Sequence, residues 1–547
     1  MGQAGFATPA PAGRRPLRPI GFQTPCSAVS GRKRAAGTRL ALTRVVLASL
    51  LSAVVVGVEA HLVHVEVDVA HGMPHFTMVG LPDAAVRESR DRVRSAIRNS
   101  GFRFPAHRVT VNLAPADLRK DGTSFDLPLA LGLLAASGEL PRRVFREVLV
   151  VGELSLDGSL QPARGVLPMS VAARRQGLTH VLLPPANAEE AAVVGGLRVL
   201  AASSLTAALA ILRDPSAATP HPPRVRPAGA PGDLDLRDVR GQLLARRAIE
   251  VAAAGAHHVL LCGPPGAGKT MLARRLPGLL PPLTDDEAIE TTAIHSVAGL
   301  LPPGGGLLTR RPFRAPHHTI SDVALVGGGA WPRPGEISLA HNGVLFLDEA
   351  PEFDRAVLEV LRQPLEEGRV RIARAARTVD FPARFLLVAA MNPCPCGYLG
   401  DPVKACRCTP PQVQRYRHRL SGPFRDRLDL IVDVPPVRPD LLTTLPEGEE
   451  SAAIVERVRL ARARQAARAP RRAAFTNAQL EGRTLREACA ATPAAQRALA
   501  RASQRLAWSA RAFDRVLKVA RTLADLAGAD QVDAEHAAEA MNFRGDS

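Results

Sequence analysis

The chain has 547 residues, of which 46% are hydrophobic and 22% are charged. These values exclude a disulfide-stapled peptide and a largely disordered chain, and at roughly 150 residues per domain they predict three or four folded domains. Lys and Arg exceed Asp and Glu by 18, which favours a polyanionic partner without identifying one. The seven cysteines are too few for a disulfide scaffold, so we expect a reduced, cytoplasmic protein.

Residues 1–41 are predicted to be a disordered basic leader, because they are rich in Gly, Pro, Ala and Arg and lack periodicity. The longest uncharged apolar run, from Val45 to Val58, is well short of the ~20 residues that a membrane-spanning helix needs. We therefore expect no membrane insertion.

Residues 42–213 are predicted to form an α/β or α+β domain, since strand-like and helix-like segments alternate there. Alternating Val residues between Val63 and Val69 indicate a strand, and Pro82-Asp83 precedes a helix with Arg and Glu on one face. The predicted segments are strands at 63–69, 108–113 and 148–151 and helices at 84–97 and 127–136.

A Pro-rich linker, residues 214–232, separates this domain from the next. Residues 233–440 open with a helix at 242–254 and a buried strand at 257–262, and the order of elements is that of a parallel sheet wrapped by helices. Residues 441–547 are rich in Ala and Arg and lack strand signals, which predicts a C-terminal helical domain.

The segment after the strand at 257–262 carries G-x-x-x-x-G-K-[ST], the pattern of a phosphate-binding P-loop. Its glycines let backbone N–H groups surround phosphates at a helix N-terminus, which predicts ATP binding. We expect Lys269 to reach the β- and γ-phosphate oxygens and the Thr270 hydroxyl to bind Mg²⁺. The predicted nucleotide-binding residues are Gly263, Pro264, Pro265, Gly266, Ala267, Gly268, Lys269, Thr270 and, from a later strand, Asp348.

The apolar residues from Val344 to Leu347 end in two carboxylates, Asp348 and Glu349. A central strand delivers such acids to the carboxyl edge of a parallel sheet, where ligands bind. We expect Asp348 to hold Mg²⁺ through water and Glu349 to orient and deprotonate the attacking water.

Further residues are predicted to assist hydrolysis. Asn392 follows a third strand, at 385–390, and is a sensor candidate, with a plain turn residue as the alternative. Phosphoryl transfer needs positive charge at the transition state, often an arginine from a neighbouring subunit, and Arg427 is the predicted finger. Arg511 and Arg515, on a helix at 510–526, are candidates for a second sensor, although both also fit an ordinary surface role in an Arg-rich segment.

Four cysteines form two C-x-C pairs within a short segment: Cys394, Cys396, Cys406 and Cys408. Four thiolates this close are able to complete a tetrahedral Zn²⁺ site, although structural zinc knuckles usually have at least two residues between paired cysteines. Reduced loop cysteines without a metal are the alternative.

Several motifs resemble those of the ComM/YifB family of magnesium-chelatase-like AAA+ ATPases. They are Val79-Gly80-Leu81-Pro82-Asp83, Val111-Asn112-Leu113-Ala114-Pro115-Ala116-Asp117, Arg314-Ala315-Pro316-His317-His318, Pro334-Gly335-Glu336-Ile337-Ser338-Leu339-Ala340-His341, Met391-Asn392-Pro393-Cys394-Pro395-Cys396-Gly397 and Arg419-Leu420-Ser421-Gly422-Pro423. The resemblance covers residues 42–545. The leader departs from it, since family members begin near residue 42, and a misassigned start codon is one explanation.

The resemblance implies a fold of three parts: a Lon-like α+β domain of the ribosomal protein S5 domain 2 type, a P-loop AAA+ core and a C-terminal helical lid. Asp121-Gly122-Thr123-Ser124 matches the segment that carries the nucleophilic Ser of Lon, but the stretch matching the Lon lysine, Gly165 to Met169, contains no Lys. Because a Ser without a base is a weak nucleophile, we expect a peptidase-inactive domain that is structural or binds partners.

The resemblance also implies a homo-hexameric ring with a hairpin directed into its pore, here residues 369–384. Its basic residues, including the DNA-contact candidates Arg369, Arg371, Arg374 and Arg377, would track phosphates of single-stranded or branched DNA without reading bases. A solvated surface hairpin is the alternative.

The expected function is that of an ATP-driven DNA translocase that promotes branch migration during DNA uptake and recombination. A chelatase motor subunit is the first alternative, but such subunits are not expected to carry a Lon-like domain. A regulatory scaffold that binds protein partners is the second.

Overall fold

The computed structural model describes residues 47–120, 122–141, 145, 147–215, 218–222, 234–302, 304–329, 332–374, 377–401, 404–437, 446–469 and 475–544. The predicted leader, residues 1–41, and residues 223–232 of the predicted linker lie outside these ranges. The side chains of Arg374 and Arg377 also lie outside the description.

The N-terminal part, residues 47–222, is built on a mixed seven-stranded sheet with the order β3-β4-β2-β1-β5-β8-β9. Strands β1 and β2 form a long antiparallel hairpin, whereas β5, β8 and β9 run parallel to β1. The apolar run that begins at Val45 supplies β1. The strands are β1 (Leu47–Val56), β2 (Glu59–Ala70), β3 (His75–Val79), β4 (Arg108–Ala114), β5 (Val148–Val150), β8 (His180–Leu183) and β9 (Arg198–Ala201), with a small hairpin of β6 (Glu153–Leu154) and β7 (Leu160–Gln161).

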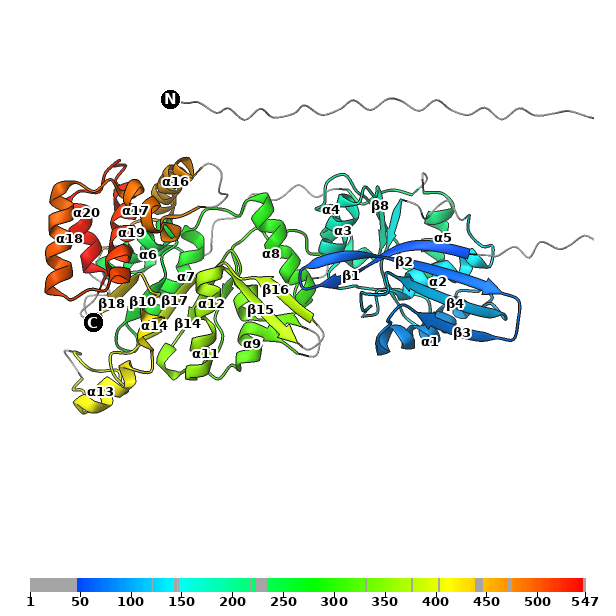
Figure 1. Cartoon of the computed structure of the whole chain (residues 1–547), viewed down its shortest axis with the longest axis horizontal. Coiled ribbons are helices and arrows are strands. Elements are labelled where there is room, and N and C mark those ends of the chain that lie inside the picture. The colour runs from blue at the N-terminus through cyan, green and yellow to red at the C-terminus, as the bar shows by residue number, and fades with distance from the viewer. Residues whose placement is uncertain are drawn as a thin grey trace, which may run out of the picture. The chain divides into compact units, whose positions relative to one another are not determined.

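Helices cover both faces of this sheet (Figure 1). Val148 and Val150 of β5 belong to one core cluster and Leu149 to another, since successive strand side chains point to opposite faces. The first cluster contains residues of α1, α2 and α5, and the second contains residues of α3 and α4. The helices are α1 (Ala84–Asn99), α2 (Asp126–Ala136), α3 (Val166–Arg175), α4 (Ala188–Ala192) and α5 (Leu205–Arg213).

The central part, residues 234–437, contains a five-stranded sheet with the order β11-β14-β17-β10-β18, and every neighbouring pair is parallel. Its strands β10, β14 and β17 are almost entirely buried, as expected for a parallel sheet covered on both faces. The strands are β10 (Val259–Cys262), β11 (Phe313–Arg314), β14 (Val344–Leu347), β17 (Leu386–Met391) and β18 (Leu430–Asp433).

Helices and two hairpins surround this sheet. The larger hairpin pairs β15 (Arg369–Arg374) with β16 (Arg377–Pro382), and the smaller pairs β12 (Gly327–Gly328) with β13 (Arg333–Pro334). The helices are α6 (Leu243–Gly255), α7 (Lys269–Leu279), α8 (Asp285–Ala298), α9 (Asp322–Val326), α10 (Glu336–Leu339), α11 (Arg355–Val360), α12 (Arg362–Glu367), α13 (Pro410–Arg417) and α14 (Gly422–Arg425).

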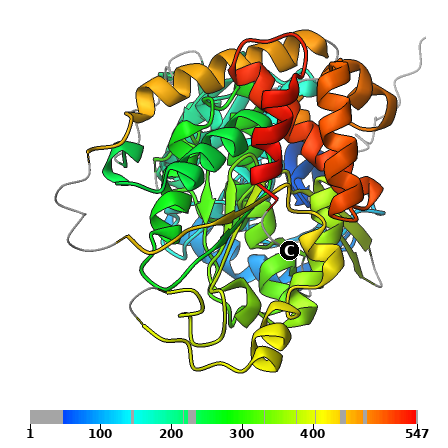
Figure 2. The same ribbon diagram turned by 90° about the vertical axis from the view of Figure 1, so that its left-hand side faces the viewer.

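The described residues after 445 are helical and contain no strand. Figures 1 and 2 show these helices gathered beside the central sheet, where α16 and α19 pack on α6. They are α16 (Ser451–Arg468), α17 (Gly482–Cys489), α18 (Pro493–Arg505), α19 (Ala510–Leu526) and α20 (Ala534–Asn542). Within the described ranges, no helix has both the length and the apolarity to cross a membrane.

The predicted α/β class with a helical C-terminal part is confirmed. The helix predicted at 84–97 is α1, which begins after Asp83, whose carboxylate accepts the Val86 amide at 2.8 Å. The helix predicted at 510–526 is α19 over the same residues. The exact domain boundaries stay predictions.

Candidate nucleotide site

The P-loop connects β10 to α7 at the carboxyl edge of the central sheet. A Cβ on Gly263 would lie 2.1 Å from the carbonyl oxygen of Val434, the residue after β18, so this position has room only for glycine. Gly266 and Gly268 have φ of 79° and 93°, and a Cβ on either would meet no atom within 4 Å. The loop is thus closely packed at its base and open around its last two glycines.

Lys269 lies inside this loop. Its Nζ donates to the carbonyls of Gly263 and Pro264 at 2.6 and 3.0 Å and to Asn392 Oδ1 at 3.2 Å. Burial lowers the pKa of Lys269, and the nearby carboxylate of Asp348 opposes that shift. An ammonium held by neutral oxygens is suited to a phosphate, which would supply the compensating negative charge.

Thr270 and Asp348 come together although they are far apart in the sequence. The Thr270 hydroxyl donates to Asp348 Oδ2 at 2.8 Å, because α7 begins beside the end of β14. A hydroxyl and a carboxylate are oxygen ligands of the kind that Mg²⁺ takes at phosphate sites. The residues present therefore fit a Mg²⁺-nucleotide at this edge of the sheet.

Glu349 follows Asp348 in a left-handed conformation with φ of 52°. Its side chain is 53% exposed, and its Oε2 lies 3.8 Å from Nδ1 of His318. The imidazole of His318 also contacts the rings of His317 and Phe353. Glu349 thus presents an exposed carboxylate at the end of β14.

Asn392 lies directly after β17, beside the P-loop. The Gly263 amide donates to the carbonyl of Met391 at 3.1 Å, so the P-loop and the end of β17 are joined by their backbones. The backbone amide of Asn392 donates to the Tyr416 hydroxyl of α13, and burial raises the pKa of that phenol to about 12. Asn392 is thus held from both sides.

Arg427 is held within its own chain. Its guanidinium is 11% exposed, donates to the Pro423 carbonyl at 2.6 Å and forms an ion pair with Glu366. The contacts of Arg427 within one chain do not test its predicted role as a finger for a neighbouring subunit. That role stays a prediction.

The two second-sensor candidates differ. Arg511 is exposed near the start of α19. The side chain of Arg515 is 16% exposed and lies 3.8 Å from Asp429. It also donates a hydrogen bond to the backbone carbonyl of Leu428. Arg515 therefore ties α19 to the segment that leads into β18.

A buried polar chain extends this connection. His257 is fully buried, with Nδ1 3.0 Å from Asp429 Oδ2 and Nε2 2.7 Å from the Thr522 hydroxyl of α19. Burial opposes ionisation of Asp429, but the hydrogen bond from His257 and the charge of Arg515 lower its pKa to about 2.

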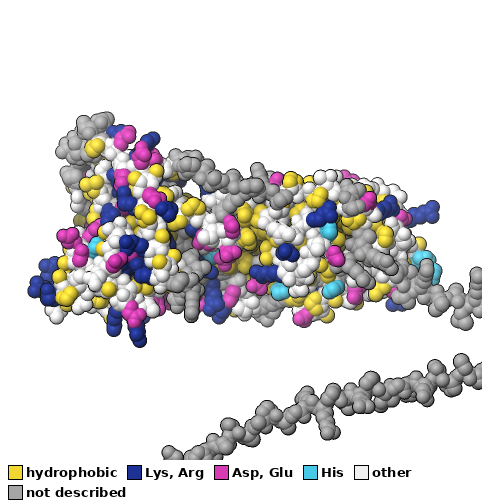
Figure 3. Space-filling view, turned by 90° about the horizontal axis from the view of Figure 1, so that it is seen from above, with side chains coloured by type: hydrophobic (Ala, Val, Ile, Leu, Met, Phe, Trp, Pro, Cys, Tyr) yellow, Lys and Arg dark blue, Asp and Glu magenta, His cyan; other side chains and the backbone are white. Residues whose placement is uncertain are grey.

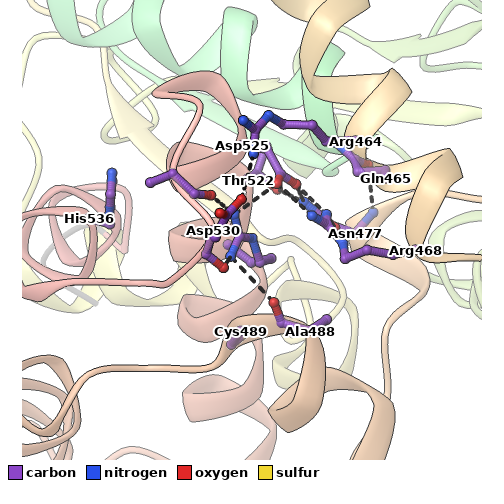
Figure 4. Close-up of polar contacts among 12 residues, drawn as sticks. Arg464, Gln465, Arg468, Asn477, Ala488, Cys489, Thr522, Asp525, Asp530 and His536 are labelled. Carbon is purple, nitrogen blue, oxygen red and sulfur yellow. Dashed lines mark hydrogen bonds and ion pairs between the residues drawn. The ribbon is translucent and has the colours of Figure 1, made fainter.

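From Thr522 the chain of contacts continues into the helical part (Figure 4). Asn477 donates to Thr522 at 3.0 Å and to Asp525 at 2.8 Å, and Arg468 donates to the same carboxylate at 2.7 Å. Figure 4 shows Arg468, from the end of α16, and Asn477, from the turn that follows it, directed toward α19. The helical C-terminal part is thereby joined to the start of β10, the strand that leads into the P-loop.

The predicted DNA-contact hairpin carries one acid, Asp380, among its arginines, and Glu367 lies two residues before it. Arg371 forms two contacts with Asp380, at 2.9 and 3.2 Å, and Arg369 lies 3.3 Å from Glu367. A hollow of about 780 Å³ lies between this hairpin and the β1–β2 turn. Its charged lining residues are Glu59, Glu290, Glu367, Arg369, Arg371, Asp380 and Arg384. The exposed charges of the described hairpin residues are thus largely paired, which leaves both alternatives open.

Elsewhere, positive and negative side chains are also mixed. On the face drawn in Figure 3, the Lys and Arg side chains of the helical C-terminal part lie among Asp and Glu side chains. The excess positive charge of the sequence is therefore not gathered into one basic patch on that face.

The four cysteines of the two C-x-C pairs meet in space, and we call Cys394, Cys396, Cys406 and Cys408 the cysteine cluster. All four Sγ atoms lie within 4.8 Å of one another. The donor set is compatible with Zn²⁺.

Several residues at the site were not predicted. Gln242, at the start of α6, donates to the P-loop carbonyl of Ala267 at 3.2 Å, and His257 and His318 act as described above. Gly397 lies against Pro265 of the P-loop, where an added Cβ would lie 2.7 Å from the proline ring. His318 and Gly397 lie in motifs that the sequence analysis quotes, but their contacts, like those of Gln242 and His257, depend on partners distant in the sequence.

Comparisons with known proteins agree with this architecture. Residues 235–442 match the family model described as magnesium chelatase, subunit ChlI. Residues 65–187 match the model described as subunit ChlI of Mg-chelatase, and residues 448–544 match its C-terminal model. The matched ranges include the P-loop, β14 and the helical C-terminal part.

Full-length relatives match as well. The chain is 46% identical over 504 residues to Competence protein ComM of Haemophilus influenzae, covering 91% of this chain and 97% of the relative. It is 46% identical over 490 residues to Uncharacterized protein YifB of Salmonella typhimurium, covering 89% and 95%. A shorter match, 30% identical over 134 residues, covers 23% of this chain and 16% of the Lon protease of Chloroflexus aurantiacus. The chain belongs to the ComM/YifB family of magnesium-chelatase-like AAA+ proteins.

Proposed function

We propose that the chain is a Mg²⁺-dependent ATPase that works in the cytoplasm as a homo-hexameric DNA translocase and drives branch migration during DNA uptake and recombination. The observation that carries the ATPase is the meeting of Lys269, Thr270, Asp348 and Asn392 at one edge of the sheet. The name of the Haemophilus relative, a competence protein, supports the DNA-uptake setting. The proposed cofactors are ATP and Mg²⁺, with Zn²⁺ at the cysteine cluster.

The proposal gives each of these residues a role. Lys269 binds the terminal phosphates, and Thr270 with Asp348 holds Mg²⁺, which supplies charge neutralisation at the phosphate oxygens. Glu349 accepts the proton of the attacking water, and Asn392, hydrogen-bonded to Lys269, orients that water. Arg427 of a neighbouring copy supplies positive charge at the transition state.

The test is steady-state ATP hydrolysis by the full chain, alone and with single-stranded, duplex and forked DNA at two salt concentrations. Glu349→Gln is expected to lower kcat by about 10²- to 10⁴-fold while nucleotide binding persists, because it removes only the base. Lys269→Ala is expected to lose nucleotide binding itself. Glu535→Gln, which changes an exposed residue of α20, is the matched control and should behave as wild type.

Stimulation by DNA that weakens with salt and disappears in Glu349→Gln supports a DNA motor. An unchanged rate with every DNA contradicts the translocase while leaving the ATPase in place. Unwinding of a forked substrate only in the presence of ATP would show that the protein moves along DNA rather than only binding it.

A chelatase motor is a second candidate, because the matching family models are named for a magnesium chelatase subunit. In that case ATP hydrolysis would drive Mg²⁺ insertion into a porphyrin by a separate catalytic subunit. ATP-dependent porphyrin metallation in the presence of such a subunit, without any response to DNA, would favour this function.

A further inference from the structure

The distances within the cysteine cluster agree with those of a tetrahedral metal site. Cys394 Sγ lies 3.4 Å from Cys396 Sγ and 3.7 Å from Cys406 Sγ, and the Cys396–Cys406 separation is 3.6 Å. Four sulfurs bound to Zn²⁺ at about 2.3 Å would be about 3.8 Å apart. A disulfide would need about 2.05 Å, and all four cysteines are free.

A backbone amide also points at one of the sulfurs. The Cys408 amide donates to Cys406 Sγ at 3.4 Å. Such an N–H group stabilises a thiolate, the form of cysteine that binds metal. The cluster thus combines four convergent sulfurs with a backbone donor.

The cluster adjoins the nucleotide site on two sides. Its first pair begins two residues after Asn392, and the Gly397 turn that follows, with φ of 85°, packs on Pro265 of the P-loop. Its second pair immediately precedes α13, whose Tyr416 hydroxyl accepts the amide of Asn392. The Arg417 guanidinium of the same helix donates to the Pro393 carbonyl at 3.4 Å. A bond between the two pairs would therefore tie together the two ends of the segment that connects Asn392 to α13.

We propose that the cysteine cluster binds one Zn²⁺ through four thiolates and that this ion positions Asn392 and the Gly397 turn against the P-loop. The zinc has no open coordination position, so it is structural and takes no part in the chemistry. None of the four cysteines contacts the reacting groups, and the cluster acts through Asn392. This positioning role rests on the proposed ATPase, whereas the metal site does not.

The first experiment measures the metal in the full chain purified without chelator. Inductively coupled plasma mass spectrometry is expected to find one zinc per chain. Co²⁺ exchanged into the site should show the thiolate charge-transfer bands and the strong d–d absorption of a tetrahedral site. The double variant Cys406→Ser/Cys408→Ser should bind Zn²⁺ at least ~10-fold more weakly. Cys489→Ser, which removes a free cysteine of α17 outside the cluster, is the control and should keep its zinc.

Absence of zinc together with absence of a Co²⁺ thiolate spectrum overturns the metal site. So does an unchanged Zn²⁺ affinity in the double serine variant, measured by competition with a chelator. Neither outcome depends on ATP hydrolysis, so the failure of this inference is separate from the failure of the proposed function.

The second experiment tests positioning. Loss of the metal is expected to lower kcat between about 10- and 100-fold, because a sensor displaced by about 1 Å no longer orients water. ATP affinity should change little, and hydrogen exchange at residues 391–401 should increase. Gly397→Ala, which keeps every thiolate but forces a Cβ toward Pro265, should keep its zinc and lose kcat. Unchanged hydrogen exchange after metal loss contradicts the positioning role, whatever the ATPase does.

Discussion

The nucleotide site and the β15–β16 hairpin both present positive charge, but the two regions neutralise it differently. Lys269 is surrounded by two carbonyls and an amide oxygen, in a loop backed by buried strands. Arg371 is exposed and already faces the carboxylate of Asp380. A phosphate therefore completes the charge balance of the first region, whereas in the second it must compete with an internal partner. The first site is preorganised for an anion, and the second is not.

Arg427 lies between these extremes, since it is nearly buried but paired with Glu366. If it serves a neighbouring subunit, Arg427→Ala should lower kcat about 10³-fold with nucleotide binding retained, because transition-state charge is lost. Glu366→Gln keeps the guanidinium and should cost less than about 10-fold. Steady-state hydrolysis and nucleotide-binding titrations measure both effects.

A mixing experiment separates action in trans from a structural role. Arg427→Ala and Glu349→Gln are each expected to be nearly inactive alone. Mixed assemblies contain interfaces with one intact Arg427 and one intact Glu349, so activity should partly return. Equal inactivity of the mixture and of each variant alone would show that Arg427 serves only its own chain.

The buried residues behind the nucleotide site predict a pH dependence of the stability of the folded chain. His258 Nδ1 accepts the Leu387 amide at 3.0 Å, and burial lowers its pKa to about 4. Asp429 opposes this shift, whereas His257, Arg515 and Lys518 add to it.

As the pH falls, this imidazole binds a proton near pH 6.5 in the unfolded chain but only near pH 4 in the folded chain. Its contribution to the free energy of unfolding is therefore fully present above pH 6.5 and is lost as the pH falls toward 4. The expected loss is on the order of 3 kcal/mol, measured from urea midpoints between pH 7 and pH 4. His258→Asn keeps an acceptor for the Leu387 amide without a titrating group and should flatten this dependence. An equal slope in the variant would assign the effect to other groups.

The DNA affinity contributed by the hairpin is expected to depend on salt and on charge substitution. The expected changes are smaller than those at the nucleotide site. Asp380→Asn frees Arg371 and should raise DNA affinity up to about 5-fold, the worth of an exposed ion pair. Arg371→Ala should lower affinity and reduce the slope of log affinity against log salt by about 1. Arg483→Ala, which breaks an exposed pair with Glu487 in α17, is the control. Identical affinities for all three variants would remove the hairpin from the DNA path.

Much of the site was predictable because several of its functional residues lie in short contiguous motifs. The P-loop pattern and the apolar run before Asp348 and Glu349 placed residues correctly relative to a strand or a helix, and the spacing of the cysteines indicated that the four thiols could meet. The pairing of Arg427 with Glu366 and of Arg371 with Asp380 was not predicted, since many arginines and acids of this chain satisfy the same local rules.

The sequence alone determined the class of fold, the phosphate-binding loop and the family, because short motifs constrain backbone conformation and ligand chemistry locally. Only the tertiary structure decided which distant groups meet. The strand order places β17 beside β10, which brings Asn392 to Lys269, and α19 packs on α6, which brings Thr522 to His257. These contacts join residues more than a hundred positions apart, and burial rather than sequence pattern holds them together.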